Sequence, residues 1–429
     1  MSAIREYVMD HELFCHHDHH ANFEAFDANR ENYTYRSLLG YAEADLFTAK
    51  GERPRDQESV TEEEVAELWH KIRVTGYGRA VSLGCRELLG MDYEPANFGA
   101  ITEALQSLIE DKSAQEIYAF LVHEKAQNAW TIQDGRFRVE NDKAFREGLF
   151  PSTYRFAFRM DPLFEMVDEA PIVALERFTE RSIHTLDQLV AALNATIDRF
   201  DATGDLAAFK VGMAYGRDLH VGDPTRYEAE RAFARIRSRK VFWDGVQQNT
   251  GAVDAQSGRP LGDYLLHCLL QRASDEDMPV QIHTGYLAGN WGSLNGTKAS
   301  HLIPIFDRYR SVRFDIFHAS WPWASELGAI AKNYPNVWPD MCWAWTMNPT
   351  ESARALSEWL DGVPFNKIFA YGADTGLPWC NVGYSLQAKR GVARVLEEKI
   401  AADLISESTA EEIADCIMLE NGKTFFDLD

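Results

Sequence analysis

Histidines are concentrated near the N-terminus of the sequence. Five of the thirteen fall within residues 11–20, in the segment HELFCHHDHH. If this segment ends a strand, side chains two residues apart point to the same side, so His17 and His19 face one way together with Cys15. Imidazole nitrogens are common zinc ligands, and two of them at a strand end make half of a metal site. A solvated polar strand end is the alternative interpretation of this cluster.

Three more ionisable residues follow apolar runs further along the sequence. His283 follows PVQI, His318 follows VRFDIF and Asp374 follows FAYGA. At the carboxyl ends of parallel strands in an α/β barrel, such residues gather on the catalytic face. A strand-end aspartate can instead cap the next helix, and a buried histidine can be a hydrogen-bonded core residue. Core packing explains three such strand ends poorly, so we expect these residues to carry chemistry.

The elements that would position these residues form a regular alternation. From about residue 128 onward, short β-rich runs alternate with helical stretches such as TLDQLVAALNATIDRF (185–200), which is typical of βα units around a parallel sheet. With HELFCHH they make eight candidate strands, the number that closes a barrel, although the same alternation could build an open doubly wound sheet. The later candidates are NAWTIQ (128–133), TYRFAFRM (153–160), AAFKVGMA (207–214), PVQIHTG (279–285), VRFDIFHA (312–319), NVWPDMCW (336–343) and KIFAYGA (367–373). We therefore predict an α/β fold, a (β/α)8 TIM barrel.

Residues 22–115 interrupt this alternation. They contain helical patterns at 61–74 and 101–112 and no clear strand. The prediction is one domain over residues 1–429, with a mostly helical insertion at 22–115 that follows the first strand and caps the barrel mouth. Elsewhere, the glycine-rich segment GAVDAQSGRPL (251–261) is predicted to be a loop.

The charge balance narrows the classes of partner. Lysine plus arginine number 43 against 66 for aspartate plus glutamate, a formal net charge of −23. Nucleic acids and anionic membrane surfaces both need a basic patch, so we expect neither as a partner. No apolar stretch approaches the roughly 18 residues of a membrane span, and the first residues lack the features of a secretory signal. The six cysteines form no CxxC pair, which favours reduced thiols and a cytoplasmic protein.

The order of the chemical residues resembles that of a known family. An H-x-H on the first strand, histidines at the ends of the fifth and sixth strands and an aspartate at the end of the eighth are similar to the amidohydrolase superfamily. Within it, VQIHTG, FDIFHASWPW and FAYGADTG resemble the amidohydrolase-related branch of metal-dependent TIM-barrel hydrolases, which includes FluG-type amidohydrolases, uronate isomerases and several decarboxylases. FAFRMDPLF (156–164) and AFKVGMAYGRDL (208–219) resemble the FluG-type members, and TGYGRAVSLGCRELLGMD (75–92) resembles the uronate isomerases.

The resemblance implies roles for individual residues. His17, His19, His283 and Asp374 would be ligands of one divalent metal, and His318 would orient or polarise the substrate beside it. Asp374 and His318 would then be the catalytic residues. Imidazole and carboxylate ligands suit zinc first, with manganese or iron as alternatives.

Some positions leave parts of this assignment open. Binuclear members bridge two metals with a carboxylated lysine from the fourth strand, where this sequence has Lys210, so the number of ions is not fixed. Uronate isomerases typically lack the fifth-strand histidine as a ligand, whereas this sequence has His283. Many members carry an aspartate where this sequence has Cys15.

Hydrolysis of an amide or other C–N bond in a small molecule is the reaction that we expect. A divalent metal supplies hydroxide at neutral pH and polarises carbonyl groups, and Asp374 would accept the proton from water. Aldose–ketose isomerisation of a uronate and metal-dependent decarboxylation are alternatives at the same centre, and a catalytically inactive ligand-binding barrel is the third. The family often assembles, so the resemblance also implies a homo-oligomer.

Cations near the predicted barrel mouth suggest that the substrate carries a carboxylate. Arg159, Lys210 and Arg217 lie in or just after the third and fourth candidate strands. Each could pair with a local acid such as Asp161 or Asp218. As a group, we expect at least one of them to bind a substrate carboxylate, for which an arginine offers a bidentate fork. Trp321, in the segment HASWPW, is the fourth predicted substrate-binding residue.

Overall fold

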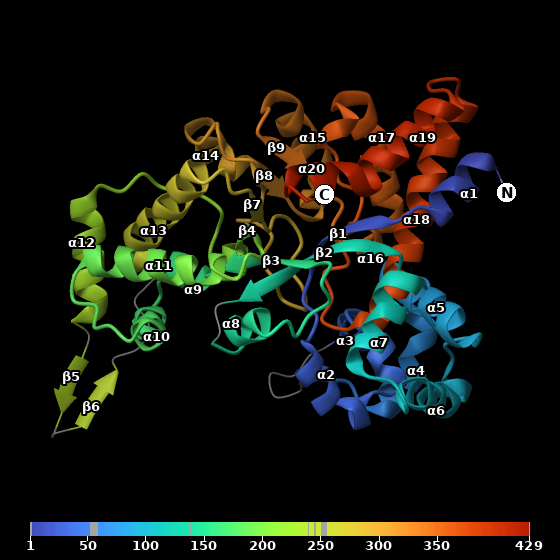
Figure 1. Cartoon of the computed structure of the whole chain (residues 1–429), viewed down its shortest axis with the longest axis horizontal. Coiled ribbons are helices and arrows are strands. Elements are labelled where there is room, and N and C mark those ends of the chain that lie inside the picture. The colour runs from blue at the N-terminus through green and yellow to red at the C-terminus, as the bar shows by residue number, and fades with distance from the viewer. Residues whose placement is uncertain are drawn as a thin grey trace.

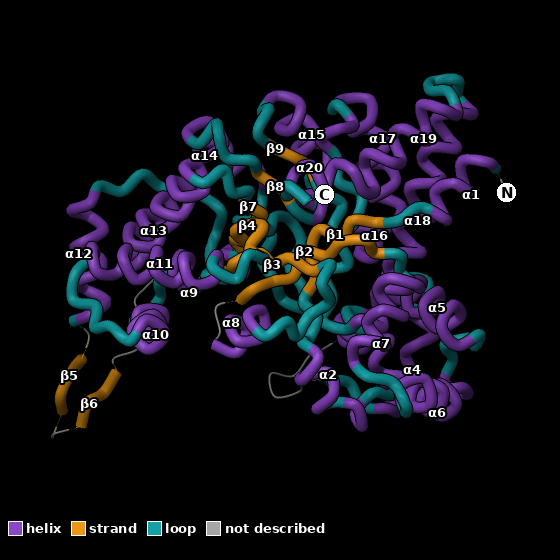
Figure 2. The backbone as a smooth tube through the Cα atoms, in the orientation of Figure 1, coloured by secondary structure: helices purple, strands orange, loops and turns teal. Residues whose placement is uncertain are grey.

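A curled parallel sheet lies at the centre of the molecule. The structure is a computed structural model that describes residues 2–51, 59–136, 139–238, 240–243, 246–249 and 255–428. Seven strands form the sheet in the order β1-β2-β3-β4-β7-β8-β9, and all neighbours in it are parallel. Their bounds are β1 (Leu13–Asp18), β2 (Asn128–Arg136), β3 (Tyr154–Arg159), β4 (Leu206–Val211), β7 (Val280–Ile282), β8 (Phe314–Ile316) and β9 (Val337–Pro339). Helices surround this sheet in the manner of a TIM barrel (Figures 1 and 2).

The segment predicted as the last strand, 367–373, is not a strand. It forms a single parallel bridge, between Phe369 and Asp340. On its other side, the His16 N–H donates to the Tyr371 carbonyl at 3.0 Å, and the Asp374 N–H donates to the His17 carbonyl at 2.8 Å. The segment thus bonds to both edges of the curled sheet.

Helices fill the chain between β1 and β2, and the described residues of this stretch form no strand. The segments predicted as helical at 61–74 and 101–112 correspond to α4 and α6. They pack around buried aromatic residues such as Trp69 and Tyr118 in an apolar cluster of their own, which extends to Trp343 of the barrel. The helices here are α2 (Phe23–Ala28), α3 (Ala42–Lys50), α4 (Glu62–Ile72), α5 (Gly76–Leu89), α6 (Phe98–Ile109) and α7 (Ala114–Tyr118).

The remaining helices pack mainly on the outside of the sheet. The predicted helix 185–200 is α11, which begins after Thr185, whose side chain accepts the Gln188 N–H in a capping box. None of the helices in the described part of the chain is long and apolar enough to cross a membrane. A separate antiparallel hairpin consists of β5 (Lys240–Trp243) and β6 (Val246–Asn249). The helices are α1 (Ala3–Asp10), α8 (Val139–Arg146), α9 (Asp161–Glu165), α10 (Ala170–Thr179), α11 (Leu186–Asp201), α12 (Arg226–Arg237), α13 (Ala255–Asp275), α14 (Ile303–Arg308), α15 (Ala324–Asn333), α16 (Ala344–Met347), α17 (Pro349–Gly362), α18 (Pro378–Ala401), α19 (Glu407–Asp415) and α20 (Asn421–Phe425).

The prediction of a loop at 251–261 is wrong for the part of this segment that the structure describes. Residues 255–261 belong to α13, and 251–254 lie outside the described residues. Gly258 in this segment and Gly262 directly after it allow helix packing: a Cβ at Gly258 would lie 1.9 Å from the Met166 carbonyl oxygen, and one at Gly262 would lie 2.2 Å from that of Phe164. Glycine here permits the close approach of α13 to the end of α9.

Replacing Gly262 with alanine is expected to destabilise the protein by about 1–3 kcal/mol, because the added methyl group overpacks a rigid backbone contact. Urea unfolding at pH 7 measures the change. The matched control is Gly99→Ala on α6, where no atom lies within 4 Å of the added carbon, so that substitution should leave stability unchanged or slightly raised. A Gly262→Ala protein as stable as the control would contradict this packing argument.

Candidate active site

The end of β1 brings two histidines to Asp374. Between Cys15 and Asp18, β1 has one more residue than β2 has between Thr131 and Gln133, so the strand carries a bulge. Bulges near active sites change the direction of side chains. His19, beyond the bulge, has its Nε2 2.8 Å from Asp374 Oδ1, and His17, within the bulge, has its Nε2 4.0 Å from the same oxygen. Three of the four predicted metal ligands therefore meet.

Asp134 completes this donor group and is a residue that the sequence did not reveal. It lies in β2, and its Oδ2 is 3.5 Å from His17 Nε2 and 3.3 Å from His19 Nδ1. One ligand atom from each of these three residues fits within 4.8 Å of the others. The predicted strand ended at residue 133, one position before Asp134. An acidic residue directly after that strand end was the sequence feature that could have indicated a further site residue.

Burial of His17 supports a cation at this place. Its side chain is 1% exposed, and its Nδ1 and Nε2 make no hydrogen bond to any described group. A buried polar atom without a partner is costly. The donors around it are imidazole nitrogens and carboxylate oxygens, which suit a divalent transition metal. The residues present therefore fit a metal ion.

The protonation states in the site are those that ligands of a metal need. Burial and, to a smaller extent, the nearby charge of Lys210 lower the pKa of His17 to about 3. Burial raises the pKa of Asp374, but His19 and His318 outweigh it and hold that pKa well below the usual value. At neutral pH, His17 is neutral and Asp374 is ionised. Both are then ready to bind a cation without losing a proton.

His318 and His283 form a second pair beside Asp374. His318 Nε2 lies 3.6 Å from Asp374 Oδ2 and 2.9 Å from His283 Nδ1. The other nitrogens face backbone carbonyls: His318 Nδ1 is 3.0 Å from the Cys342 oxygen, and His283 Nε2 is 2.9 Å from the Tyr286 oxygen. A carbonyl only accepts, so those two nitrogens carry the protons.

With these protons assigned, the lone pairs of His318 Nε2 and His283 Nδ1 face each other. Burial lowers the pKa of both rings, to about 4 for His318 and well below 6.5 for His283, and their mutual interaction lowers that of His283 further. Both are therefore neutral at pH 7, and His318 Nε2 and His283 Nδ1 have no proton to share. A cation close to either nitrogen would relieve the contact. The ligand role of His283 stays a prediction.

Two of the predicted substrate-binding cations lie with this group. Arg159 pairs with Asp134 at 2.8 Å and with Asp161. Lys210 is buried with its Nζ 3.3 Å from the centre of the Phe317 ring. Burial, partly offset by the negative charge of Asp374, leaves its pKa lowered to about 8.

Arg217 and Trp321 are placed differently. Arg217 pairs with Asp263 at 2.7 Å and donates to the Phe164 carbonyl, so its contacts hold α13 and α9 together. None of its contacts with described residues involves the histidine and aspartate group. The Trp321 ring lies 5.3 Å from that of Tyr286, whose carbonyl holds His283. Trp321 therefore reaches the site through Tyr286. Arg217 contacts α13 and α9 instead of the site.

A cavity of about 570 Å³ opens beside Arg159, and Glu165 lines it. Burial, together with the like charge of Asp161, raises the pKa of Glu165 to about 7 from 4.5. Between these two pH values the folded protein binds more protons than the unfolded chain, so this group's contribution to stability falls as the pH rises.

Replacing Glu165 with glutamine should therefore stabilise the protein at pH 8, by about 1 kcal/mol after allowance for partial solvent exposure, and have little effect at pH 5. Thermal melting at the two pH values measures the difference. Glu147→Gln, at an exposed glutamate paired with Lys143, is the control and should show no such pH dependence. Equal effects of Glu165→Gln at both pH values would contradict the raised pKa.

Comparisons with known proteins bear on the family and the fold. A family model described as amidohydrolase matches residues 212–428. Protein fluG of Emericella nidulans is 29% identical over 176 residues, which make 39% of this chain and 20% of that protein, so the match spans about a fifth of that relative. A uronate isomerase from Thermotoga maritima has a TM-score of 0.78 at 12% identity, with 99% of this chain and 96% of that one covered. A glucuronate isomerase from Caulobacter crescentus has a TM-score of 0.76 at 16% identity, with 99% and 93% covered. Both solved structures show a shared fold.

Proposed function

Because this chain belongs to the amidohydrolase family, we propose that it is a metal-dependent hydrolase that cleaves an amide or other C–N bond of a small, carboxylate-bearing substrate. The placement of Asp374 carries the proposal. Its Oδ1 is 2.8 Å from His19, and its Oδ2 is 3.6 Å from His318. One oxygen can therefore belong to the ligand group while the other faces the substrate side.

The proposed ligands of the ion are His17, His19, His283 and Asp374, with Asp134 close enough to hold the two N-terminal histidines in place. Zinc is the first candidate, and manganese and iron are alternatives. When bound, such an ion lowers the pKa of water from 15.7 to about 7 and polarises a carbonyl group.

The side chains of this protein would move the protons. Asp374, ionised at neutral pH, accepts the proton of the attacking water and later delivers it to the leaving nitrogen. The Cys342 carbonyl fixes the ring of His318 at Nδ1, so that Nε2 stays directed at Asp374 and orients the substrate. Lys210, which forms no ion pair within the described chain, is the proposed cation for a substrate carboxylate, whereas Asp134 and Asp161 already neutralise Arg159.

The helical segment 22–115 would act as a cap. Tyr41, before α3, lies 4.8 Å from the Trp343 ring, and Trp343 lies 5.3 Å from His318. Tyr77 of α5 also approaches Trp343, at 6.2 Å between ring centres. These aromatic contacts exclude water from one side of the site, which strengthens electrostatic interactions inside it.

Aldose–ketose isomerisation of a uronate is the second candidate. It is supported by the likeness of fold to the two isomerases, which extends over 99% of this chain and so includes the helices between β1 and β2. The same Asp374 and His318 would then move a proton between neighbouring carbon atoms of the sugar.

Product mass separates the two reactions. The metal-loaded protein is incubated with N-acyl amino acids, γ-glutamyl amides and uronates, and the products are analysed by mass spectrometry. Hydrolysis gives two products whose summed mass exceeds the substrate by one water, whereas isomerisation leaves the mass unchanged. Conversion of uronates alone, at constant mass, would overturn the hydrolase proposal. The Asp374→Asn protein, purified in the same way, controls for contaminating enzymes.

A further inference from the structure

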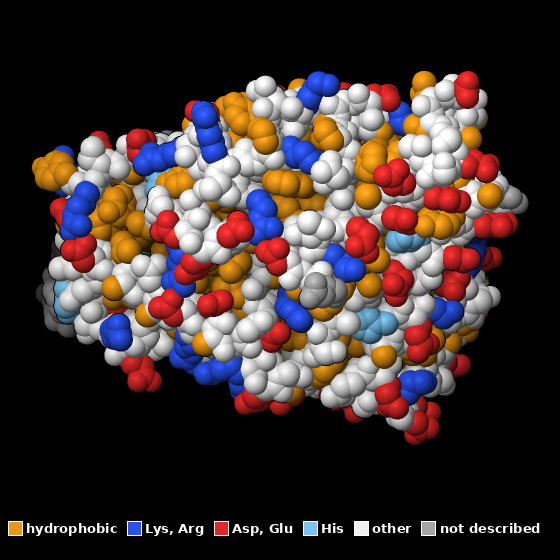
Figure 3. Space-filling model, turned by 45° about the horizontal axis from the view of Figure 1, so that its top comes forward, with side chains coloured by type: hydrophobic (Ala, Val, Ile, Leu, Met, Phe, Trp, Pro, Cys, Tyr) orange, Lys and Arg blue, Asp and Glu red, His pale blue; other side chains and the backbone are white. Residues whose placement is uncertain are grey.

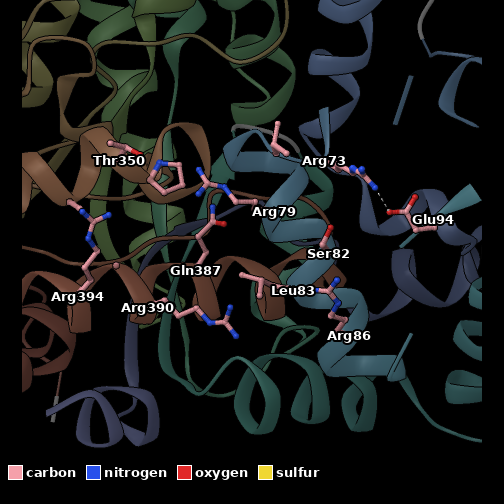
Figure 4. Close-up of a pocket in the computed structure, with 14 residues that line it drawn as sticks. Arg73, Arg79, Ser82, Leu83, Arg86, Glu94, Thr350, Gln387, Arg390 and Arg394 are labelled. Atoms are coloured by element: carbon pink, nitrogen blue, oxygen red, sulfur yellow. Dashed lines mark hydrogen bonds and ion pairs between the residues drawn. The ribbon is translucent and has the colours of Figure 1, made fainter. Parts of the chain in front are cut away.

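An arginine-lined cavity lies away from the metal ligands, between α5, α17 and α18. Its volume is about 560 Å³, and Figure 4 shows its lining side chains. Arginines dominate the lining, two from α5, two from α18 and one from the end of α4, and the lining contains a single acid, Glu94. The arginines are Arg73, Arg79, Arg86, Arg390 and Arg394.

Three of these arginines already have acidic partners at the surface. Arg73 pairs with Glu94 at 3.0 Å, Arg86 with Asp92 at 2.5 Å, and Arg394 with Glu398 at 2.7 Å. All six side chains are at least 40% exposed. Exposed pairs of this kind contribute only about 0–1 kcal/mol each, so a ligand can compete for these guanidinium groups.

The other two, Arg79 and Arg390, pair with no carboxylate in the described part of the chain. Arg79 Nε has a long contact of 3.4 Å to the Thr75 carbonyl, which leaves most of its donors available. Arg79 comes from α5 and Arg390 from α18, and Figure 4 shows Arg79 extending toward the side of Thr350 and Arg390 extending toward Leu83 of α5. The pocket therefore holds two guanidinium groups that no protein acid neutralises.

Such an excess of positive charge is unusual in this protein. The chain carries a net charge of −23, and on the face shown in Figure 3 acidic and basic side chains are interspersed. Placing the unpaired guanidinium groups of Arg79 and Arg390 in one pocket with three further arginines costs free energy through mutual repulsion. An anion that bridges them removes that cost, and the planar fork of arginine suits carboxylate and phosphate oxygens.

The rest of the lining fits a small organic anion. Helix α17 begins at Pro349, and its second residue, Thr350, lines the pocket, so the positive end of the helix dipole adds to the field there. Val74, which is 70% exposed, and Leu83 supply apolar surface. The lining thus combines anion donors with a patch for a carbon skeleton.

From this arrangement we propose that the pocket binds a small multivalent oxyanion, a phosphate ester or a polycarboxylate, held chiefly by Arg79 and Arg390. The bound anion bridges α5 and α18 and competes with Glu94, Asp92 and Glu398 for the remaining arginines. The site is separate from the metal centre and its ligand need not be the substrate.

Isothermal titration of the full chain tests this with inorganic phosphate and with tricarballylate, each against sodium chloride of equal ionic strength. The expected result is saturable binding of at least one anion, weakened tenfold or more in the double variant Arg79→Ala/Arg390→Ala. The variant Arg79→Lys/Arg390→Lys should bind with intermediate affinity, because lysine keeps the charge and loses the fork. Preference for phosphate points to a phosphate ester, and preference for tricarballylate points to a polycarboxylate.

The matched control is Arg354→Ala on α17. Arg354 is an exposed arginine that pairs with Glu351 and Glu358 and is not among the pocket residues, so its loss should leave anion binding unchanged. Two results would overturn the proposal: no binding beyond that of chloride, or undiminished binding in the double alanine variant, which would place the anion elsewhere, for example at the metal centre.

Discussion

Replacing Asp374 with asparagine is expected to lower kcat by about 10²- to 10⁴-fold, the range found when a general base is removed. Asparagine has nearly the same shape but cannot accept the proton of water. The asparagine amide is also a weaker metal donor than the carboxylate oxygen Oδ1, the proposed ligand atom, which lies 2.8 Å from His19 Nε2. Initial rates on the best substrate measure the loss, and elemental analysis of the protein measures how much metal is retained.

The control for this substitution is Asp361→Asn. Asp361 is an exposed aspartate on α17 that pairs with Lys399 at 2.7 Å, and its loss should leave kcat within about twofold, as for most surface changes. An Asp374→Asn protein that retains a tenth or more of the wild-type turnover would remove Asp374 from the catalytic step.

Replacing His318 with asparagine should lower kcat by about 10²-fold or more while the metal content stays unchanged. The reason is geometric: His318 reaches Asp374 Oδ2 at 3.6 Å, whereas His17 and His19 lie at the other oxygen. Asparagine is too short to reach from the same backbone position. Rates and metal content are measured on the same preparation.

His70→Asn, at an exposed histidine on α4 that contacts the Glu67 carbonyl, is the matched control and should have no effect. Loss of the ion together with the imidazole would make His318 a ligand. Full turnover with the ion in place would instead make it a structural residue. Either outcome contradicts the proposed role.

The strands could be predicted well from the sequence, and the site only in part. Alternation of apolar runs located β1, β2, β3 and β4 within a few residues, because buried strands must be apolar and their ends polar. Asp134 was missed because Asp134-Gly135 is a typical turn dipeptide. In the structure both residues continue β2, and Gly135 fits against β3, where a Cβ would lie 3.0 Å from the Ala157 carbonyl oxygen.

Glycine was also misleading at 251–261, for the same physical reason. Glycine permits both close packing of two backbones and a turn. The sequence does not distinguish these two roles, because they depend on whether another element packs against the glycine. The arginine-lined pocket could not be predicted from the sequence for another reason. Arg79 and Arg390 lie on helices far apart in the sequence, and nothing in either segment indicates that the two helices face each other.

The contact between the end of β1 and the segment that contains Asp374 joins residues that are synthesised at very different times. The Thr375 N–H donates to Asp18 Oδ1 at 2.9 Å, across 357 residues of chain. A ribosome releases His17 and His19 first, and contacts between such distant residues are made late in folding. The complete donor group therefore exists only in a chain that has been synthesised past residue 374, and a nascent chain that stalls earlier has the two imidazoles without the carboxylate of the proposed ligand set.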